Sequence, residues 1–442
     1  MRALVLILAL LGGCRTTRTV DPRVARLEAV FDRLHHRGQF TGAIVVGDRD
    51  HVIWQRGYGE ANVEHHVAFT PDTAGDAASI AKTFTAALVV ALAAEGKLDL
   101  DAPVQRLLPE LPYPTITLRH LLSHASGIPV LDYDDFDRLM PATELRTTER
   151  LLAIVGEQAR PLLFEPGTQF RYSSFGYDLA ALAAARATGM SFGALLEQRF
   201  WRPLGMRSAF LRPGRFAEFP GVRTLGYRDG KVFDVFDREA FHGGSNIYVS
   251  AADLHRWNVY WLAHPVAALL EPARIAGARS GISLGSWYQS NDRSAFWYPG
   301  HLQGFHSVVF RTSRYSIAYI ANNTLDPWLH HAIVRAIVAI LDGRPPPTLA
   351  PPAVVALASS DRSALAGRWI LGDGEQLDID PEGRTIARDG VRYLIVPGSD
   401  TSLYVPGLDY ILGVAKDDRG AVVRLCVSTN LEQRWATRAG RE

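Results

Sequence analysis

Residues 77–95 read AASIAKTFTAALVVALAAE, and this stretch decides the fold because it is apolar on nearly every side. A helix that lacks a polar face is buried inside a larger body, and Gly96 directly after it is a typical helix end. The stretch opens with Ser79 and Lys82, which lie three residues apart and therefore share one face of a helix. The sequence predicts a central helix from Ser79 to Glu95 that brings an amine within reach of a serine hydroxyl.

Lysine is rare in this chain, which makes the amine informative. Among 47 basic residues only Lys82, Lys97, Lys231 and Lys416 are lysine. A guanidinium keeps its proton, whereas a buried amine can lose its own and act as a base. Ser79 also lies at a helix start, where free backbone N–H groups and the positive end of the helix dipole favour a developing oxyanion. A single Ser-x-x-Lys pattern is common by chance, so its context has to decide.

The composition sets broad limits on function. The chain has 442 residues, enough for two or three domains, with 47% hydrophobic and 21% charged residues. A net charge of +1 without any basic run argues against nucleic acid as a partner. No phosphate-binding glycine loop occurs, so no organic cofactor is predicted. No metal site is predicted either, because the adjacent histidines of each pair point to different sides of an element; the pairs are His35-His36, His65-His66 and His330-His331.

The N-terminus has the features of an export signal. Arg2 precedes an apolar run, residues 3–11, that is too short to span a bilayer but fits a signal peptide. The sequence Leu11-Gly12-Gly13-Cys14 resembles a bacterial lipobox. We expect a lipoprotein signal peptide at residues 1–13, a lipidated Cys14 at the start of a tether (14–22), and an exported protein held on a membrane in the periplasm or cell envelope. The alternative is an ordinary secretory signal that contains a cysteine.

The rest of the chain divides into two regions separated by prolines. Residues 23–343 form the larger predicted domain, residues 344–358 a stiff proline-rich linker, and residues 359–442 a small all-β domain. The larger domain is expected to contain helices at 24–37 and 329–341, hairpins at 42–58 and 305–323, and a mixed helical region to about residue 290. Five short runs predict the strands of the small domain, namely 368–371, 391–396, 402–405, 410–414 and 422–427.

A second motif lies between residues 166 and 177, which read PGTQFRYSSFGY. Tyr172 in this motif is a plausible proton shuttle if an ammonium lies beside it. Taken alone, Tyr172 is more typical of a packing aromatic.

Together these stretches resemble the serine β-lactamase and penicillin-binding protein superfamily, in its class C and esterase-like branch, over roughly residues 25–343. Five ordered blocks carry the resemblance, and they are residues 77–85, 95–101, 116–128, 203–206 and 250–254. The resemblance implies an α+β fold, in which an antiparallel sheet is flanked by helices and joined to an all-helical lobe. The small C-terminal domain resembles the barrel-like extension that some members of the superfamily carry.

The resemblance also implies roles for individual residues. Ser79 would be the acylated nucleophile, Lys82 would accept its proton or set the local field, and Tyr172 would help activate Ser79 and protonate the leaving group. The family's second motif usually has asparagine two residues after the tyrosine, where this chain has Ser174. A serine keeps one hydrogen-bonding group but loses the reach of the amide, so recognition of a lactam or peptide side chain is less expected than acyl transfer itself.

At the third motif this chain differs from the family pattern more than at the second. The motif's usual form is a lysine or histidine followed by a small residue and glycine, and the favoured alignment places Tyr298-Pro299-Gly300 there. The main-chain N–H of His301 would then join that of Ser79 as the oxyanion hole. The alternative takes His301 itself as the motif histidine, but it leaves no glycine two positions later. With Tyr298 in place of a cation, neutral esters or amides become more plausible substrates than carboxylates.

These observations predict a serine hydrolase that forms an acyl-enzyme with a small-molecule or peptide substrate, as an esterase, D-amino-acid peptidase or β-lactamase-like enzyme. His124 could pose as a catalytic histidine, but its motif favours a packing role. The competing hypothesis is a catalytically inactive binding protein, similar to a penicillin-binding protein, that holds a cell-wall or partner ligand. The altered second and third motifs favour that alternative, whereas the intact trio of Ser79, Lys82 and Tyr172 counts against it.

Overall fold

The fold is described from a computed structural model. It covers residues 21–49, 51–129, 137–234, 237–325, 327–347, 349, 359–372, 374–399, 402–417, 419–430 and 432–439. The predicted signal peptide, the lipidated Cys14, nearly all of the tether and most of the proline-rich linker lie outside these residues, and they stay predictions.

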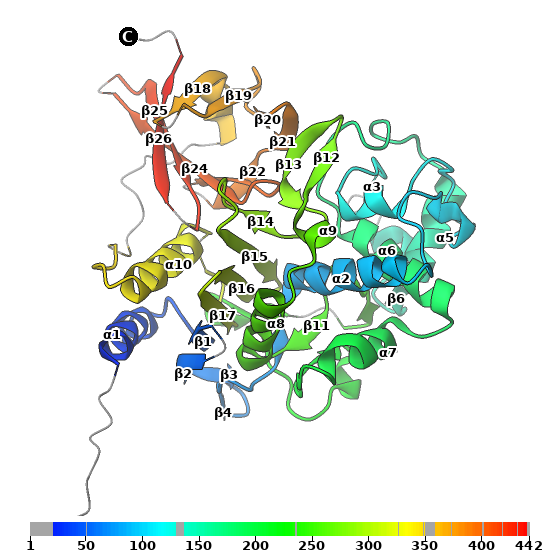
Figure 1. Ribbon diagram of the computed structural model, residues 1–442, viewed down its shortest axis with the longest axis horizontal. Helices are drawn as coiled ribbons and strands as arrows, with labels where there is room; N and C mark the ends of the chain where they lie inside the picture. The colour runs from blue at the N-terminus through cyan, green and yellow to red at the C-terminus, as the bar shows by residue number, and fades with distance from the viewer. Residues whose placement is uncertain are drawn as a thin grey trace, which may run out of the picture.

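An antiparallel sheet of eight strands forms the centre of the larger domain (Figure 1). Its strand order is β12-β13-β14-β15-β16-β17-β1-β2, so the N-terminal hairpin completes a sheet built mainly from the C-terminal half of the domain. The strands are β1 (Gly42–Asp48), β2 (His51–Tyr58), β12 (Pro272–Ile275), β13 (Ala278–Ser283), β14 (Tyr288–Gln289), β15 (Ala295–Leu302), β16 (Phe305–Thr312) and β17 (Tyr315–Ala321). β17 is buried along its whole length, which is expected of a strand covered on both faces.

Helices cover both faces of this sheet. α1 (Pro22–His36) and α10 (Pro327–Leu341) lie together on one side, and α8 (Ala251–Ala263) and α2 (Ala81–Ala94) lie on the other (Figure 1). A lobe beyond α2 contains α3 (Leu118–Leu122), α5 (Thr148–Gln158), α6 (Ser174–Thr188) and α7 (Phe192–Leu196). The short α9 (Ala267–Leu270) lies against α2 on the side of the sheet, just before β12. Among the described residues no single helix is long and apolar enough to cross a membrane. By length and composition only, α6 and the helical segment Phe192–Trp201 would together meet that criterion, but the two are bent by 82° relative to each other.

The central helix has the environment that its sequence predicts. Eleven residues of α2 are buried, and Gly96 ends the helix in the left-handed conformation at a φ of 72°. Phe84 stacks on Trp257 of α8 at 4.2 Å between ring centroids, and the Trp257 indole donates to the Thr83 hydroxyl at 3.0 Å. The helix is therefore fixed between the sheet and the lobe, with its first turn at the boundary of the two.

The C-terminal region forms a second antiparallel sheet, with the order β21-β20-β19-β18-β26-β25-β24-β23-β22. Its two edge strands are consecutive in the chain with only Ile395 between them, so the sheet curves round like a barrel that is nearly closed. The strands are β18 (Gly367–Leu371), β19 (Gln376–Ile379), β20 (Thr385–Arg388), β21 (Val391–Leu394), β22 (Val396–Ser399), β23 (Ser402–Val405), β24 (Tyr410–Lys416), β25 (Val422–Ser428) and β26 (Gln433–Arg438). The predicted α+β organisation and the all-β character of the C-terminal region are confirmed.

Two details of the prediction were wrong. The region expected to be mixed helical up to about residue 290 includes β12, β13 and β14, which extend the central sheet. These strands are only two to six residues long, so none contains a period-two run long enough to identify a strand. In the C-terminal sheet, β19, β20 and β26 were not predicted, and the run 391–396 is divided between two strands because the chain turns at Ile395.

Candidate active site

Ser79 lies in a short 3-10 turn, Ala78–Ile80, that leads into α2. The residue before it, Ala78, has a φ of 50°, a left-handed conformation that alanine rarely adopts. Neighbouring groups hold this backbone: the Asp76 carboxylate accepts the Ala78 N–H at 2.7 Å, and the Ser307 hydroxyl of β16 donates to the Ala77 carbonyl at 2.7 Å. The surrounding sheet therefore enforces a strained turn that presents Ser79 at the start of the helix.

Lys82 is completely buried, and its amine sits among three oxygens. The distances from Nζ are 2.6 Å to the Gly244 carbonyl, 3.1 Å to Ser174 Oγ and 3.2 Å to Ser79 Oγ. A carbonyl oxygen can only accept, so one N–H of the amine points at Gly244. The remaining directions serve the two hydroxyls, which fixes the amine beside the predicted nucleophile.

Tyr172 completes the group of residues that the sequence singled out. Its hydroxyl lies 2.8 Å from Ser79 Oγ, and the Lys82 amine lies 4.9 Å from the centre of its ring. In this contact the Tyr172 hydroxyl donates to Ser79 Oγ. Ser79, Lys82 and Tyr172 come from two segments more than ninety residues apart in the chain, yet they form one hydrogen-bonded set.

His124 supports Tyr172 from behind. The two rings stack at 4.4 Å with an angle of 22° between their planes, and His124 Nδ1 accepts the backbone N–H of Ser173 at 3.0 Å. Burial holds the pKa of His124 well below its usual range, and the charge of Lys82 acts in the same direction. A neutral imidazole stacked in this way positions the phenol of Tyr172.

Ser174 occupies the position at which the family usually has asparagine. It is the first residue of α6, and the helix is capped by Ser173, whose hydroxyl accepts the N–H of Gly176 at 3.1 Å. The Ser174 hydroxyl is directed at Lys82, at the 3.1 Å given above. Ser174 therefore keeps the contact to the lysine with a much shorter side chain.

The third motif lies on β15, and side chains on a strand alternate between its faces. Tyr298 points to the site, with its hydroxyl 3.3 Å from that of Tyr172, and it is 1% exposed. His301 belongs to the other face, where its ring lies 3.7 Å from that of His306 and 5.6 Å from that of His330. The structure thus places Tyr298 beside Ser79, whereas the imidazole of His301 points away. The oxyanion role of the His301 main-chain N–H stays a prediction.

Gly300 faces the same side of β15 as Tyr298 and allows the strand to approach the nucleophile. A Cβ at this position would lie 2.3 Å from the Ala77 carbonyl oxygen and 2.3 Å from Ser307 Oγ. A methyl group would therefore push β15 away from the strained turn before Ser79. We expect Gly300→Ala to cost about 1–3 kcal/mol in the free energy of unfolding and to lower esterase turnover.

Urea unfolding and ester hydrolysis measure the two effects of Gly300→Ala. Gly372→Ala is the matched control, because no atom lies within 4 Å of the Cβ it would introduce. Equal stability and turnover in the two variants would show that this close approach is unimportant.

Sequence reasoning missed the pair Gly243-Gly244, which lies directly beside the amine. Gly243 has a φ of 132°, and a Cβ there would lie 2.5 Å from the Tyr177 carbonyl oxygen. Thr85 of α2 donates to the Gly243 carbonyl at 2.7 Å, and the carboxylate of Asp178 accepts the Gly244 N–H at 2.7 Å. The Gly-Gly doublet was a local signal for such a backbone approach, but the sequence did not show what it approaches.

Two buried carboxyls near the site have raised pKa values. Burial raises the pKa of Asp76 to about 7, against the opposing effects of the Ala78 N–H and the charge of Arg212. Burial also raises the pKa of Asp178 to about 6, and the charge of Lys82 opposes that change. Both groups support the site through backbone N–H bonds, so their protonation affects the stability of the site.

Asp76 gives a prediction for the pH dependence of stability. The carboxyl binds its proton up to about pH 7 in the folded chain but releases it near pH 4 when unfolded. Its contribution to stability is thus fully present below about pH 4 and is lost as the pH rises through about 7. Asp76→Asn stays neutral, so its unfolding free energy relative to the native chain should increase over that range by on the order of 4 kcal/mol.

Urea unfolding at about pH 4 and about pH 8 tests this difference. Asp72→Asn removes the same charge from an exposed position four residues away and serves as the control. If both variants show the same pH trend, Asp76 is not the group responsible.

Three comparisons relate this geometry to known proteins. The sequence model of the family described as Beta-lactamase matches residues 27–341. Penicillin-binding protein 4* of Bacillus subtilis (strain 168) is 23% identical over 418 residues, which covers 86% of this chain and 91% of that protein. Esterase EstB of Burkholderia gladioli is 32% identical over 224 residues, which covers 47% of this chain and 55% of the esterase.

Among solved structures, the octameric penicillin-binding protein homologue from Pyrococcus abyssi superposes with a TM-score of 0.62 at 19% identity. The match covers 93% of this chain and 99% of that one, so it includes the C-terminal sheet as well as the central sheet. At this identity the likeness concerns the fold alone.

Proposed function

The chain belongs to the β-lactamase family, and from that premise we propose that it is a serine hydrolase that cleaves neutral esters or amides through an acyl-enzyme on Ser79. The observation that carries the proposal is the contact of Ser79 Oγ with two groups, the Tyr172 hydroxyl at 2.8 Å and the Lys82 amine at 3.2 Å. A serine needs such partners to become a nucleophile.

The proposed acylation follows from these contacts. Ser79 Oγ attacks the substrate carbonyl and passes its proton to Tyr172, which enters this step as a phenolate, while the ammonium of Lys82 stabilises the negative charge on the phenolate and the developing tetrahedral intermediate. Tyr172 then gives the proton to the leaving alcohol or amine as the carbonyl–leaving-group bond breaks. The main-chain N–H groups of Ser79 and His301 are the proposed donors to the oxyanion.

Deacylation reverses these roles. Water attacks the acyl carbonyl and gives a proton to the Tyr172 phenolate, and Tyr172 then returns that proton to Ser79 Oγ as the acyl–oxygen bond breaks. Because Lys82 is buried, its charge acts in a site of low dielectric and stabilises the negative charge of both steps more strongly than it would in water.

Tyr298 supports the preference for neutral substrates. Burial raises the pKa of this phenol well above its usual range, and a neighbouring tyrosine acts in the same direction, so the group stays neutral. A neutral phenol at the position where the family usually has a cation offers a carboxylate no charge partner. The similarity to an esterase at 32% identity is consistent with this preference.

Covalent labelling tests the proposal. The full chain is treated with a fluorophosphonate, a fluorescent penicillin, and a panel of p-nitrophenyl esters, lactams and D-alanyl peptides, and adducts are detected by intact mass. We expect labelling by the fluorophosphonate, an acyl adduct with at least one neutral ester, and loss of both in Ser79→Ala. Labelling that survives in Ser79→Ala would exclude Ser79 as the nucleophile. If no reagent forms an adduct with the native chain, the inactive binding protein is the better description.

Tyr298→Lys tests the proposed basis of specificity. Adding an ammonium at this position should raise kcat/KM for a carboxylate-bearing ester, relative to the matching neutral ester, by about tenfold, because one charge-assisted hydrogen bond is worth about 1.5–3 kcal/mol before its desolvation is subtracted. Tyr298→Met introduces a side chain of similar length without the charge and is the control. An equal shift in both variants would assign the preference to shape rather than to charge.

A further inference from the structure

Four histidines and one carboxylate gather on the face of β15 that points away from Ser79. His301 and His306 are cross-strand partners on β15 and β16, and His330 and His331 lie in the first turns of α10. The carboxylate is Asp409, which precedes β24 in the C-terminal sheet. The group therefore joins three elements of the larger domain to the second sheet, and none of its side chains belongs to the proposed acyl-transfer site.

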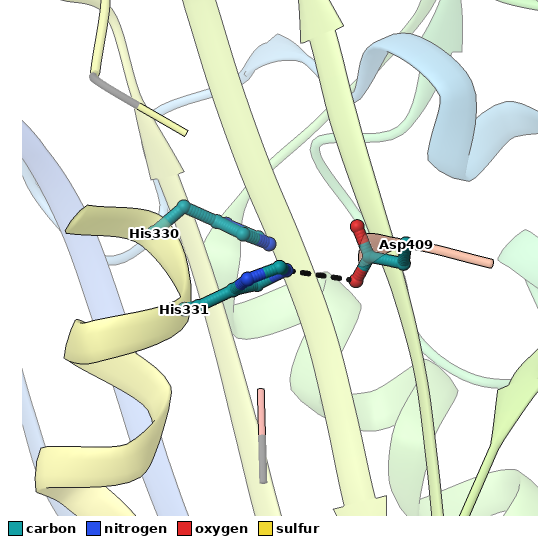
Figure 2. Close-up of side chains that lie close together, drawn as sticks. All are labelled: His330, His331 and Asp409. Atoms are coloured by element: carbon teal, nitrogen blue, oxygen red, sulfur yellow. Dashed lines mark hydrogen bonds and ion pairs between the residues drawn. The ribbon is translucent and has the colours of Figure 1, made fainter. Parts of the chain in front are cut away.

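Three members of this group converge. One ligand atom each from His330, His331 and Asp409 lies within 4.8 Å of the other two, and the three side chains are at most 1% exposed. His331 Nε2 lies 3.2 Å from Asp409 Oδ2. Figure 2 shows both imidazoles extending from α10 toward the carboxylate. Two ligands of a tetrahedral zinc ion lie about 3.4 Å apart, so the widest pair would need to close by at most ~1.4 Å.

The second observation is a set of buried imidazole nitrogens without partners. Among the described residues, no hydrogen bond is made by His330 Nε2, His331 Nδ1 or His306 Nε2. A buried polar atom left without a partner costs free energy. An imidazole binds a metal through a ring nitrogen that carries no proton, so these nitrogens are available as ligand atoms.

Neighbouring side chains orient the possible ligands. The Tyr319 hydroxyl lies 2.8 Å from His330 Nδ1, so the free nitrogen of that ring is Nε2. Asp409 Oδ2 accepts from the Trp297 indole at 2.7 Å and from the Asn430 amide at 2.9 Å. Its other oxygen accepts from the Tyr404 hydroxyl at 3.0 Å. Metal-binding histidines and carboxylates commonly have hydrogen bonds of this kind behind them.

We propose that this cluster binds one divalent transition-metal ion of the zinc class, with the converging His330, His331 and Asp409 as ligands. His306, whose ring lies 5.3 Å from that of His330, would move toward the ion as the fourth ligand. Imidazole nitrogen combined with a carboxylate oxygen is a donor set that suits Zn²⁺. His301 lies near the end of β15, with its ring 3.7 Å from that of His306. A closed set of four protein ligands is typical of a structural site, and here it ties α10 to the C-terminal sheet.

The sequence argued against this site for a sound local reason. Adjacent histidines on a helix point about 100° apart, so His330-His331 does not have the spacing of a chelating pair. In the structure the two rings are brought together by a third residue. Asp409, which lies 78 residues after His331 in the chain and in the C-terminal region, lies close to both rings.

Metal binding to the untagged full chain tests the proposal. The chain is stripped with a chelator, dialysed, and titrated with Zn²⁺ by calorimetry and with Co²⁺ by visible absorption, while bound metal is counted by elemental analysis. We expect one ion per chain, a Co²⁺ spectrum of tetrahedral type, and a higher melting temperature with Zn²⁺. His330→Gln and Asp409→Asn should each weaken binding at least tenfold, whereas His66→Gln, at an exposed histidine, should not.

Several outcomes separate this site from the alternatives. If no ion binds stoichiometrically, or if the ion binds equally well to His330→Gln, the cluster is only a hydrogen-bonded contact between domains and the proposal is wrong. If Asp409→Asn does not fold, then His306→Gln replaces it as the second ligand variant. Turnover of a p-nitrophenyl ester by the stripped native chain should equal that of the zinc-loaded chain below their melting temperatures, and zinc-dependent turnover would overturn the structural assignment.

Discussion

Lys82→Arg is expected to lower kcat for ester hydrolysis by about a thousandfold, because the residues of a catalytic unit act together and losing one removes most of the activity. The amine of Lys82 is a single nitrogen that meets the Gly244 carbonyl and two hydroxyls. A guanidinium is planar and spreads its N–H groups over three nitrogens, so it cannot donate three hydrogen bonds from one atom as the lysine amine does, and it does not lose its proton. The larger group also has to fit a site in which the lysine side chain is completely buried.

Steady-state hydrolysis of a p-nitrophenyl ester and the rate of fluorophosphonate labelling measure this loss. Lys97→Arg is the matched control, because Lys97 is half-exposed and pairs with Glu95 at 3.1 Å at the other end of the same helix. Circular dichroism and the melting temperature show whether Lys82→Arg remains folded. A folded Lys82→Arg variant with activity close to that of Lys97→Arg would mean that the amine has no special role.

Tyr172→Phe is expected to lower kcat/KM by about 10²–10³-fold, within the range that a general acid or base contributes. The substitution removes only the hydroxyl that lies 2.8 Å from Ser79 Oγ. It leaves the ring, which stacks on His124, in place, so the packing of the site is preserved.

Tyr298→Phe provides the comparison for this prediction. It removes a second phenol hydroxyl from the same site, but that hydroxyl contacts the Tyr172 hydroxyl, at 3.3 Å, rather than Ser79 Oγ. We expect Tyr298→Phe to lose less than about tenfold, since a single neutral hydrogen bond is worth about 1 kcal/mol. Equal losses in the two variants would show that the phenols act as a pair and that Tyr172 alone is not the proton carrier.

Much of the architecture follows from local patterns. The all-apolar helix, the two hairpins of the central sheet and the helix that ends the larger domain lie close to their predicted ranges. The spacing of apolar residues predicts these elements, because each element buries one face and that face appears in the sequence as a regular apolar pattern. β12, β13 and β14 were missed because they are short and owe their state to the neighbouring strands of the sheet rather than to their own pattern.

In the proposed acyl-transfer site, too, the sequence predicts some contacts and only the tertiary structure shows the others. Ser79 and Lys82 share one helical face, so their proximity is a local property that the sequence states directly. Tyr172 was linked to them through the resemblance to a family, and its distance to Ser79 comes from the packing of α6 against α2. Gly244, Asp178 and His124 support the lysine and tyrosine through backbone contacts, and no spacing in the sequence predicts these contacts.

The sequence by itself determined a buried helix that opens with a serine and a lysine, because helical periodicity acts over three or four residues. The tertiary structure decided which groups surround that pair. The direction of each side chain on β15 put Tyr298 at the nucleophile and His301 on the opposite face. The tertiary structure also brought His330 and His331 close to Asp409. Contacts between such distant segments depend on how whole elements pack and not on the residues near them in the chain.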